Sequence, residues 1–202
     1  RSPSRGLGDV YKRQEFKLGI IPTVAPYLLP LFIDKFQKKC PGVNLIIKEL
    51  TTEEIINDLK NYKLDAGILA TPLHEQSLYE DILYYEPFWI YANKSHGISN
   101  KTTVTPKDLD VNDALLLTSG HCFRDQALEL CSSNKNVKGK LALESGSFET
   151  LVNLVDKLPK FTLLPELLVR SFPKQRRARL RAFSGKNSPT REISLIYNVS
   201  IA

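Results

Sequence analysis

The chain has 202 residues, of which 42% are hydrophobic and 25% are charged, and its formal net charge is +6. This composition is typical of a globular protein that is long enough to bury a core without metals or disulfides. No run approaches the roughly 18–20 apolar residues of a membrane-spanning helix, and no signal-peptide pattern opens the chain. We therefore expect no membrane partner and a cytoplasmic location.

Positive charge is concentrated in two segments. Residues 1–14 are basic, rich in turn formers and without periodicity, so we interpret them as a non-native scar or a disordered segment. Residues 174–181, KQRRARLR, form either a solvated face or a DNA-binding surface, and the lack of interleaved aromatic residues favours the solvated face. The chain stops directly after an apolar run, and we expect it to be a fragment of a longer protein.

From residue 15 onward, apolar strands alternate with helices. We expect strands over residues 16–21, 43–49 and 64–69. A helix is expected over residues 27–39, and a second begins with the N-cap and acidic first turn of residues 51–54. This β-α-β-α-β order predicts a parallel sheet.

A second α/β unit follows the strand expected over residues 88–92. Its strands are expected over residues 114–117, 140–144 and 161–164, and its helices begin near residues 123, 147 and 165. A final strand over residues 193–197 is expected to return to the first unit. We assign residues 15–91 and 191–202 to lobe I and residues 92–190 to lobe II. The predicted fold is α/β, with two Rossmann-like lobes and a cleft between them, where ligands commonly bind.

The three cysteines are too few for a disulfide scaffold, and only Cys122 and Cys131 are close in sequence. In a cytoplasmic chain such thiols are reduced at rest. No CxxC motif or Cys/His cluster has the spacing of a zinc site, so we expect neither a metal nor a cofactor.

Several segments resemble the effector-binding domains of LysR-type transcription regulators. Residues 19–30, GIIPTVAPYLLP, resemble their first strand and helix, and residues 64–68, 148–152 and 162–165 resemble later landmarks. Residues 120–131, GHCFRDQALELC, resemble the peroxide-sensing loop of the OxyR group within that family. We expect the family's winged helix-turn-helix and C-terminal helix to lie outside this fragment. Its glycine-rich turn is replaced by residues 156–161, with Leu158 and Lys160 where glycines are usual.

This resemblance implies a type 2 periplasmic-binding-protein-like fold and the peroxide-sensing domain of a transcription activator, not an enzyme. It implies that Cys122 is the sensing thiol and Cys131 the resolving one, and that the two are joined by a disulfide on oxidation. Three groups would orient hydrogen peroxide, namely Thr23, Thr52 and His121, and Arg191 would hold the switching region. The implied partners are hydrogen peroxide, further copies in a homodimer or tetramer, DNA and RNA polymerase through the full-length protein, and a reductant such as glutaredoxin or thioredoxin.

The chemistry of residues 120–131 agrees with a peroxide-sensing role. The thiolate is the form that attacks peroxide, and a helix N-terminus near Cys122 favours an anion. His121 and Arg124 are close enough in sequence to assist, and Asp125 either pairs with a cation or occupies the favourable first turn. If residues 123–131 are helical, the two cysteines lie about 13–14 Å apart. A disulfide needs Cα atoms within roughly 7 Å, so the segment must unwind.

Other readings remain open at this stage. Cys131 suits the role of a small core residue, Thr23 that of a turn residue and Thr52 that of an N-cap. The chain fits an ordinary LysR effector domain or a solute-binding protein that binds an organic anion, with incidental cysteines. A thiol peroxidase would share the sulfur chemistry but would turn over with a reductant.

Overall fold

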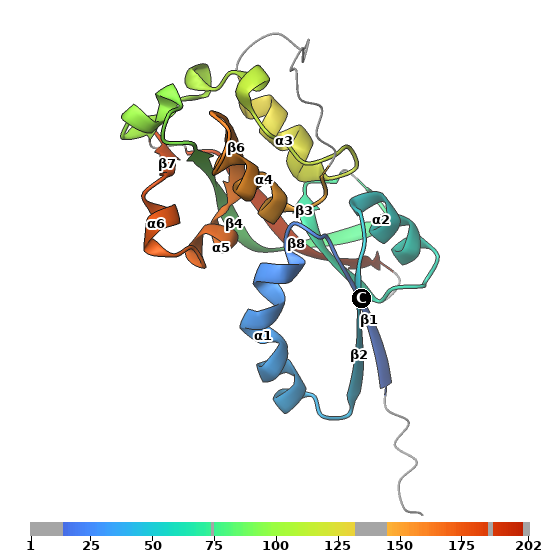
Figure 1. Ribbon diagram of the computed structural model, residues 1–202. Coiled ribbons are helices and arrows are strands. Elements are labelled where there is room, and N and C mark those ends of the chain that lie inside the picture. Colours follow the sequence, from blue (N-terminus) through green and yellow to red (C-terminus); the bar gives the residue numbers. More distant parts are fainter. Residues whose placement is uncertain (1–13, 74, 132–144, 186–187, 200–202) are drawn as a thin grey trace, which may run out of the picture.

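The computed structural model describes residues 14–73, 75–131, 145–185 and 188–199. Eight strands form one continuous, curled sheet in the order β2-β1-β3-β8-β4-β7-β5, with β6 paired to β4. Two separate hydrophobic cores lie along this sheet, one in each lobe. Figure 1 shows α1 and β2 extending away from the helices of the other lobe.

Lobe I contains the predicted β-α-β-α-β unit. Its elements are β1 (Gln14–Ile20), α1 (Ala25–Lys39), β2 (Val43–Glu49), α2 (Thr52–Lys60) and β3 (Ala66–Thr71). Strand β1 pairs in parallel with both β2 and β3, which confirms the predicted parallel sheet. Strand β8 (Thr190–Asn198) lies antiparallel to β3, so the final strand does return to this lobe.

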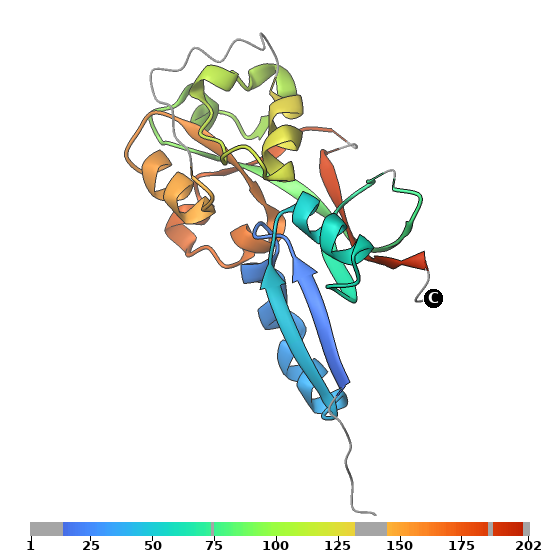
Figure 2. The ribbon, with the colours of Figure 1, turned by 90° about the vertical axis from the view of Figure 1, so that its right-hand side faces the viewer.

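Close packing of α2 on the sheet explains a glycine of β3. A Cβ atom at Gly67 would lie 2.5 Å from Cγ2 of Ile55, a fully buried residue of α2. Only glycine permits this approach, which brings the N-terminus of α2 next to the turn after β1. Figure 2 shows β1 and β2 side by side along α1.

Strand β4 (Leu78–Ala92) runs through both lobes. Its residues from Leu78 to Pro87 pair with β8, whereas those from Phe88 onward pair with β6 (Phe161–Pro165) and β7 (Leu180–Phe183). The predicted strand covered only residues 88–92. The first part was missed because its side chains are largely exposed and a bulge between Ile82 and Tyr84 breaks the alternation.

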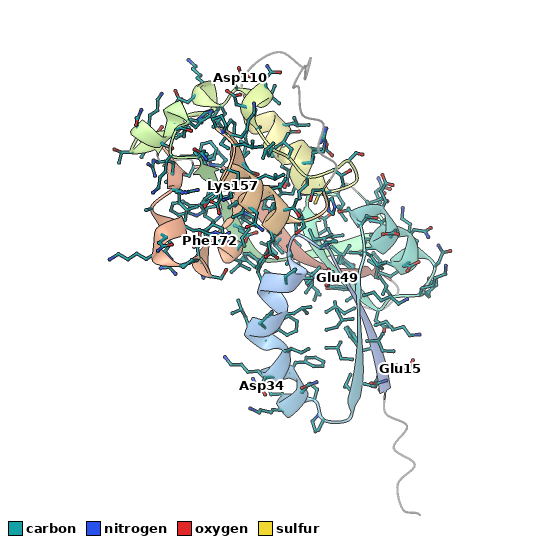
Figure 3. All side chains as sticks on the ribbon, in the orientation of Figure 1. Glu15, Asp34, Glu49, Asp110, Lys157 and Phe172 are labelled. Carbon is teal, nitrogen blue, oxygen red and sulfur yellow. The ribbon has the colours of Figure 1, made fainter. Side chains whose placement is uncertain are left out.

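Lobe II is covered by short helices. They are η1 (Gly97–Asn100), η2 (Pro106–Asp108), η3 (Val111–Asp113), α3 (Cys122–Leu130), α4 (Phe148–Val155), α5 (Glu166–Arg170) and α6 (Lys174–Arg177), and β5 (Thr103–Val104) completes the sheet. The predicted helices near residues 123, 147 and 165 are confirmed. Asp110 lies at the outer end of this lobe, far from Glu15 and Asp34 at the outer end of lobe I (Figure 3).

The strand predicted over residues 114–117 is wrong. Only an isolated bridge joins Ala114 to Phe161, and the chain then turns so that the Thr118 amide donates to the Ser145 carbonyl. The apolar run is explained by burial, because Leu115 and Leu117 enter the core from an irregular segment. The strand predicted over residues 140–144 lies outside the described residues.

The turn over residues 156–161 is built without the usual glycines. Among the described residues, Tyr62 is the only non-glycine residue with positive φ, so neither Leu158 nor Lys160 adopts a left-handed backbone. The Lys160 ammonium donates to Asp113 at 2.7 Å, which ties the turn to η3. The substituted residues therefore form a turn of ordinary backbone geometry.

The arginines of the basic segment 174–181 form hydrogen bonds to other parts of the same chain. Arg176 and Arg179 donate to the carboxylate of Asp156 at 3.2 and 2.5 Å. Arg177 and Arg181 donate to backbone carbonyls. Four guanidinium groups are thus engaged by the fold itself, which favours the solvated face over a DNA-binding surface. None of the described helices is long and apolar enough to cross a membrane.

Candidate functional site

Helix α3 begins at Cys122, one residue before the predicted start. Gly120 has φ +95°, a left-handed conformation that favours glycine, and it turns the chain into the helix. His121 is the N-cap residue and makes no side-chain capping bond, so its imidazole is not used to close the helix end. The Cys122 thiol therefore lies in the first turn, where free N–H groups and the helix dipole favour an anion.

A narrow pocket surrounds this thiol. It is lined by residues from the turn after β1, the start of α2 and the start of α3: Ile21, Pro22, Thr23, Thr51, Thr52, Gly120, His121 and Cys122. The structure thus brings together four predicted site residues from three separate parts of the sequence, namely Thr23, Thr52, and the adjacent His121 and Cys122. The pocket does not admit a water-sized sphere, so a ligand enters only when its side chains move outward.

Thr51, not Thr52, is the N-cap of α2. The Thr51 hydroxyl accepts a hydrogen bond from the Glu54 amide at 3.3 Å, and the Glu54 carboxylate accepts one from the Thr51 amide at 2.8 Å. The interpretation of Thr52 as an N-cap is therefore wrong. Among the described residues the buried Thr52 hydroxyl has no hydrogen-bond partner, although buried polar groups nearly always have one. This hydroxyl is free to bind a small polar ligand in the pocket.

The surroundings of His121 favour its neutral imidazole over the charged form. Burial lowers the pKa of His121 below its ordinary value of 6.5, because desolvation disfavours the charged ring. A Cβ atom at Gly146 would lie 3.3 Å from Nε2 of His121, so glycine leaves room for the ring. A neutral imidazole beside Cys122 offers one N–H donor and one acceptor.

Arg191, at the start of β8, connects the two sides of the pocket. Its Nε donates to Oε2 of Glu86 at 2.8 Å, its Nη2 lies 2.7 Å from the same oxygen in an ion pair, and its Nη1 donates to the Thr23 hydroxyl at 3.0 Å. Nη2 also donates to the Thr23 carbonyl at 3.2 Å. The guanidinium carbon lies 4.9 Å from the ring centroid of Phe123, the residue after Cys122. One side chain thus holds both the turn after β1 and the first turn of α3.

Glu86 was missed by the sequence reasoning. It is buried in β4, yet its polar character and its position before Pro87 gave no apolar or alternating pattern. The available signal was a carboxylate at the edge of an otherwise apolar strand, which requires a buried cationic partner.

Arg124 and Asp125 serve the helix itself. Nη1 of Arg124 donates to the Leu117 carbonyl at 2.9 Å, which ties α3 to the preceding segment and engages the guanidinium there. Asp125 is exposed in the first turn, and no ion pair joins it to another described residue. Of its two predicted roles, the favourable first-turn position fits the structure.

Cys131 is the C-cap of α3. It is half-buried against the core of lobe II, and burial together with the charge of Asp110 raises the pKa of Cys131 to about 11. All three cysteines are free thiols. The intact helix puts Cys122 and Cys131 about 13–14 Å apart, at 1.5 Å per residue.

Nothing in the described residues suggests a bound metal. They contain no group of three or more His, Cys, Asp or Glu side chains arranged to hold an ion.

Comparison with known proteins identifies the family. Residues 11–200 match the LysR substrate binding domain. The chain is 32% identical over 182 residues to the HTH-type transcriptional regulator EstR of Acinetobacter baylyi, covering 90% of this chain and 60% of that protein. It is 33% identical over 182 residues to the hydrogen peroxide-inducible genes activator of Pectobacterium carotovorum, covering 89% and 59%. The chain thus spans about 60% of the length of these relatives, whose names are those of regulators and not of enzymes.

The fold is also similar to that of a solved structure. The crystal structure of OxyR from Porphyromonas gingivalis superposes with a TM-score of 0.85 at 27% identity, covering 94% of this chain and 86% of that chain. The predicted fold class, an α/β domain with two lobes like those of type 2 periplasmic binding proteins, is confirmed.

Proposed function

Since this chain belongs to the LysR substrate binding domain family, we propose that it is the peroxide-sensing regulatory domain of a transcription activator. The observation that carries the proposal is the position of Cys122, in the first turn of α3 and in one pocket with Thr23, Thr52 and His121. These neighbours carry hydroxyl and imidazole groups, which can form hydrogen bonds to the two oxygen atoms of hydrogen peroxide. An ordinary surface cysteine would have no such surroundings.

The first step oxidises Cys122. Its thiolate attacks one oxygen of hydrogen peroxide, the O–O bond breaks, and the second oxygen leaves as hydroxide and takes up a proton to become water. The sulfur loses two electrons and becomes a sulfenic acid. Thr23, Thr52 and His121 orient the two peroxide oxygens. Because the pocket is too narrow for a water-sized sphere, peroxide entry requires its side chains to move outward.

The second step forms the disulfide. The Cys131 sulfur attacks the sulfenic sulfur, a second water leaves, and one peroxide with two thiols has given one disulfide and two waters. The separation of about 13–14 Å along α3 must fall below roughly 7 Å, so α3 unwinds and the segment refolds. This change of local structure is the two-state element through which oxidation alters the rest of the protein.

The output lies in the remainder of the full-length protein. We propose that it binds DNA and RNA polymerase there and acts as a homodimer or tetramer. A thiol reductant such as glutaredoxin or thioredoxin resets the switch, which places the protein in the cytoplasm, where thiols are reduced at rest.

Intact mass measured with and without a few equivalents of hydrogen peroxide, followed by peptide mapping, tests the proposal. The expected result is a loss of two hydrogens and a peptide in which Cys122 is joined to Cys131. The variant Cys122→Ser should lose the bond, Cys131→Ser should stop at a sulfenic acid that dimedone traps, and the control Cys40→Ser should behave as the parent chain. Unchanged free thiols in the parent chain would overturn the proposal.

The match to the LysR substrate binding domain favours a second candidate, a domain that binds an organic effector. Calorimetric screening separates the two functions. Tight binding of an organic anion, with no response of the thiols to peroxide, would support this alternative.

A further inference from the structure

A buried ion pair lies behind the pocket. Glu86 and Arg191 are each only 2% exposed. Buried charges are retained only when their bonding capacity is met, and both oxygens of Glu86 are used. Oε2 accepts from the Arg191 guanidinium, and Oε1 accepts from the Leu167 amide at 3.0 Å, in the first turn of α5. Glu86 therefore fixes Arg191 in position and in orientation.

The fixed guanidinium determines how the Thr23 hydroxyl bonds. A guanidinium has donors and no acceptor, so Oγ1 of Thr23 accepts from Nη1 of Arg191 at 3.0 Å. The hydroxyl hydrogen is then left to donate to another group. Thr23 lines the pocket that contains Cys122, so this hydrogen is available to an oxygen bound there.

We propose that Glu86 is a positioning residue for the oxidation of Cys122: it holds Arg191 so that the Thr23 hydroxyl donates its hydrogen to peroxide. The inference rests on the function proposed above. Glu86 itself does not line the pocket and acts only through Arg191 and Thr23.

The variant Glu86→Gln keeps the shape of the side chain but has one carbonyl oxygen for the two bonds that the carboxylate accepts. We expect peroxide to oxidise Cys122 about 10- to 100-fold more slowly, as for a small displacement of an orienting group. Alkylation of Cys122 by iodoacetamide uses the thiolate but no peroxide-orienting hydroxyl, so its rate should change less than about twofold. If the substitution only disturbed the structure around Cys122, the rates of peroxide oxidation and of iodoacetamide alkylation would change together.

A matched control and a double variant sharpen the test. Glu80 lies on the same strand and accepts from the Leu73 amide at 3.1 Å, so Glu80→Gln should leave both rates unchanged. Thr23→Val removes the hydroxyl and should slow peroxide oxidation, and Glu86→Gln added to it should slow the reaction no further. If the double variant is slowed by the product of the two single fold-reductions in rate, the proposal is overturned, because Glu86 then acts by a route other than Thr23.

Folding is checked by the urea midpoint of each variant. If Glu86→Gln does not fold, Arg191→Lys replaces it, because an ammonium cannot reproduce the guanidinium bonds to Glu86 and Thr23 together, and the same slowing is expected. Equal peroxide rates in the parent chain and in the folded variant would refute the role of Glu86 alone. A parent chain that peroxide does not oxidise would refute the proposed function, and this inference with it.

Discussion

Cys131 provides a quantitative test of how far the fold suppresses the reactivity of a half-buried thiol. Burial and the charge of Asp110 raise the pKa of Cys131 from 9.0 to about 11. A rise of two pKa units lowers the thiolate fraction about 100-fold at any pH well below 9. Since the thiolate is the reactive form, iodoacetamide should alkylate Cys131 about 100-fold more slowly in the folded chain than in the chain unfolded by urea.

The assay uses a variant in which Cys40 and Cys122 are replaced by serine, so that Cys131 is the single thiol. In the folded variant the rate should rise about tenfold per pH unit toward pH 11, whereas in urea it should level off near pH 9. Asp110→Asn should speed the folded reaction only in part, because burial is the larger cause. Folded and unfolded rates within a few-fold of each other, with a common plateau near pH 9, would refute the reasoning.

Three further predictions concern the pocket and its support. Arg191→Met leaves Glu86 buried without its cation and should lower the free energy of unfolding by about 3–5 kcal/mol in urea titrations; a loss below 1 kcal/mol would contradict this. Gly120→Ala forces a left-handed backbone on a residue with a Cβ and should cost about 1–3 kcal/mol, seen as a lower Tm. Burial lowers the pKa of His121, so its neutral form is the one that the fold favours; stability from this group is complete above pH 6.5 and falls as the pH drops below that value. NMR titration should find the pKa of His121 below 6.5, and His121→Gln should flatten the acid side of the stability profile.

The elements that the sequence predicted well are those with a strong local pattern. The β-α-β-α-β unit has long apolar runs separated by clear stops, and the start of α3 has Gly120 before it. The N-cap of α2 was expected within residues 51–54, but the interpretation of Thr52 as the cap overlooked the capping box, in which a glutamate three residues on selects Thr51.

Long-range bonds were not readable in the same way. Glu86 and Arg191 are 105 residues apart, and no local pattern pairs a carboxylate with one of many arginines. The short apolar run at residues 114–117 fits a strand or a buried loop equally well, and only the tertiary contacts decide between them. The resemblance pointed to Arg191, whereas its partners emerged only from the fold.

The passage of β4 through both lobes has a consequence for the way the protein melts. Each lobe has its own core, and two cores on separate elements would be free to unfold in two transitions. Here the single strand β4 belongs to both halves of the sheet, paired with β8 before residue 88 and with β6 and β7 after it. Loss of either half strips hydrogen bonds from the strand that the other half requires. The two lobes should therefore lose their structure together, in a single cooperative transition.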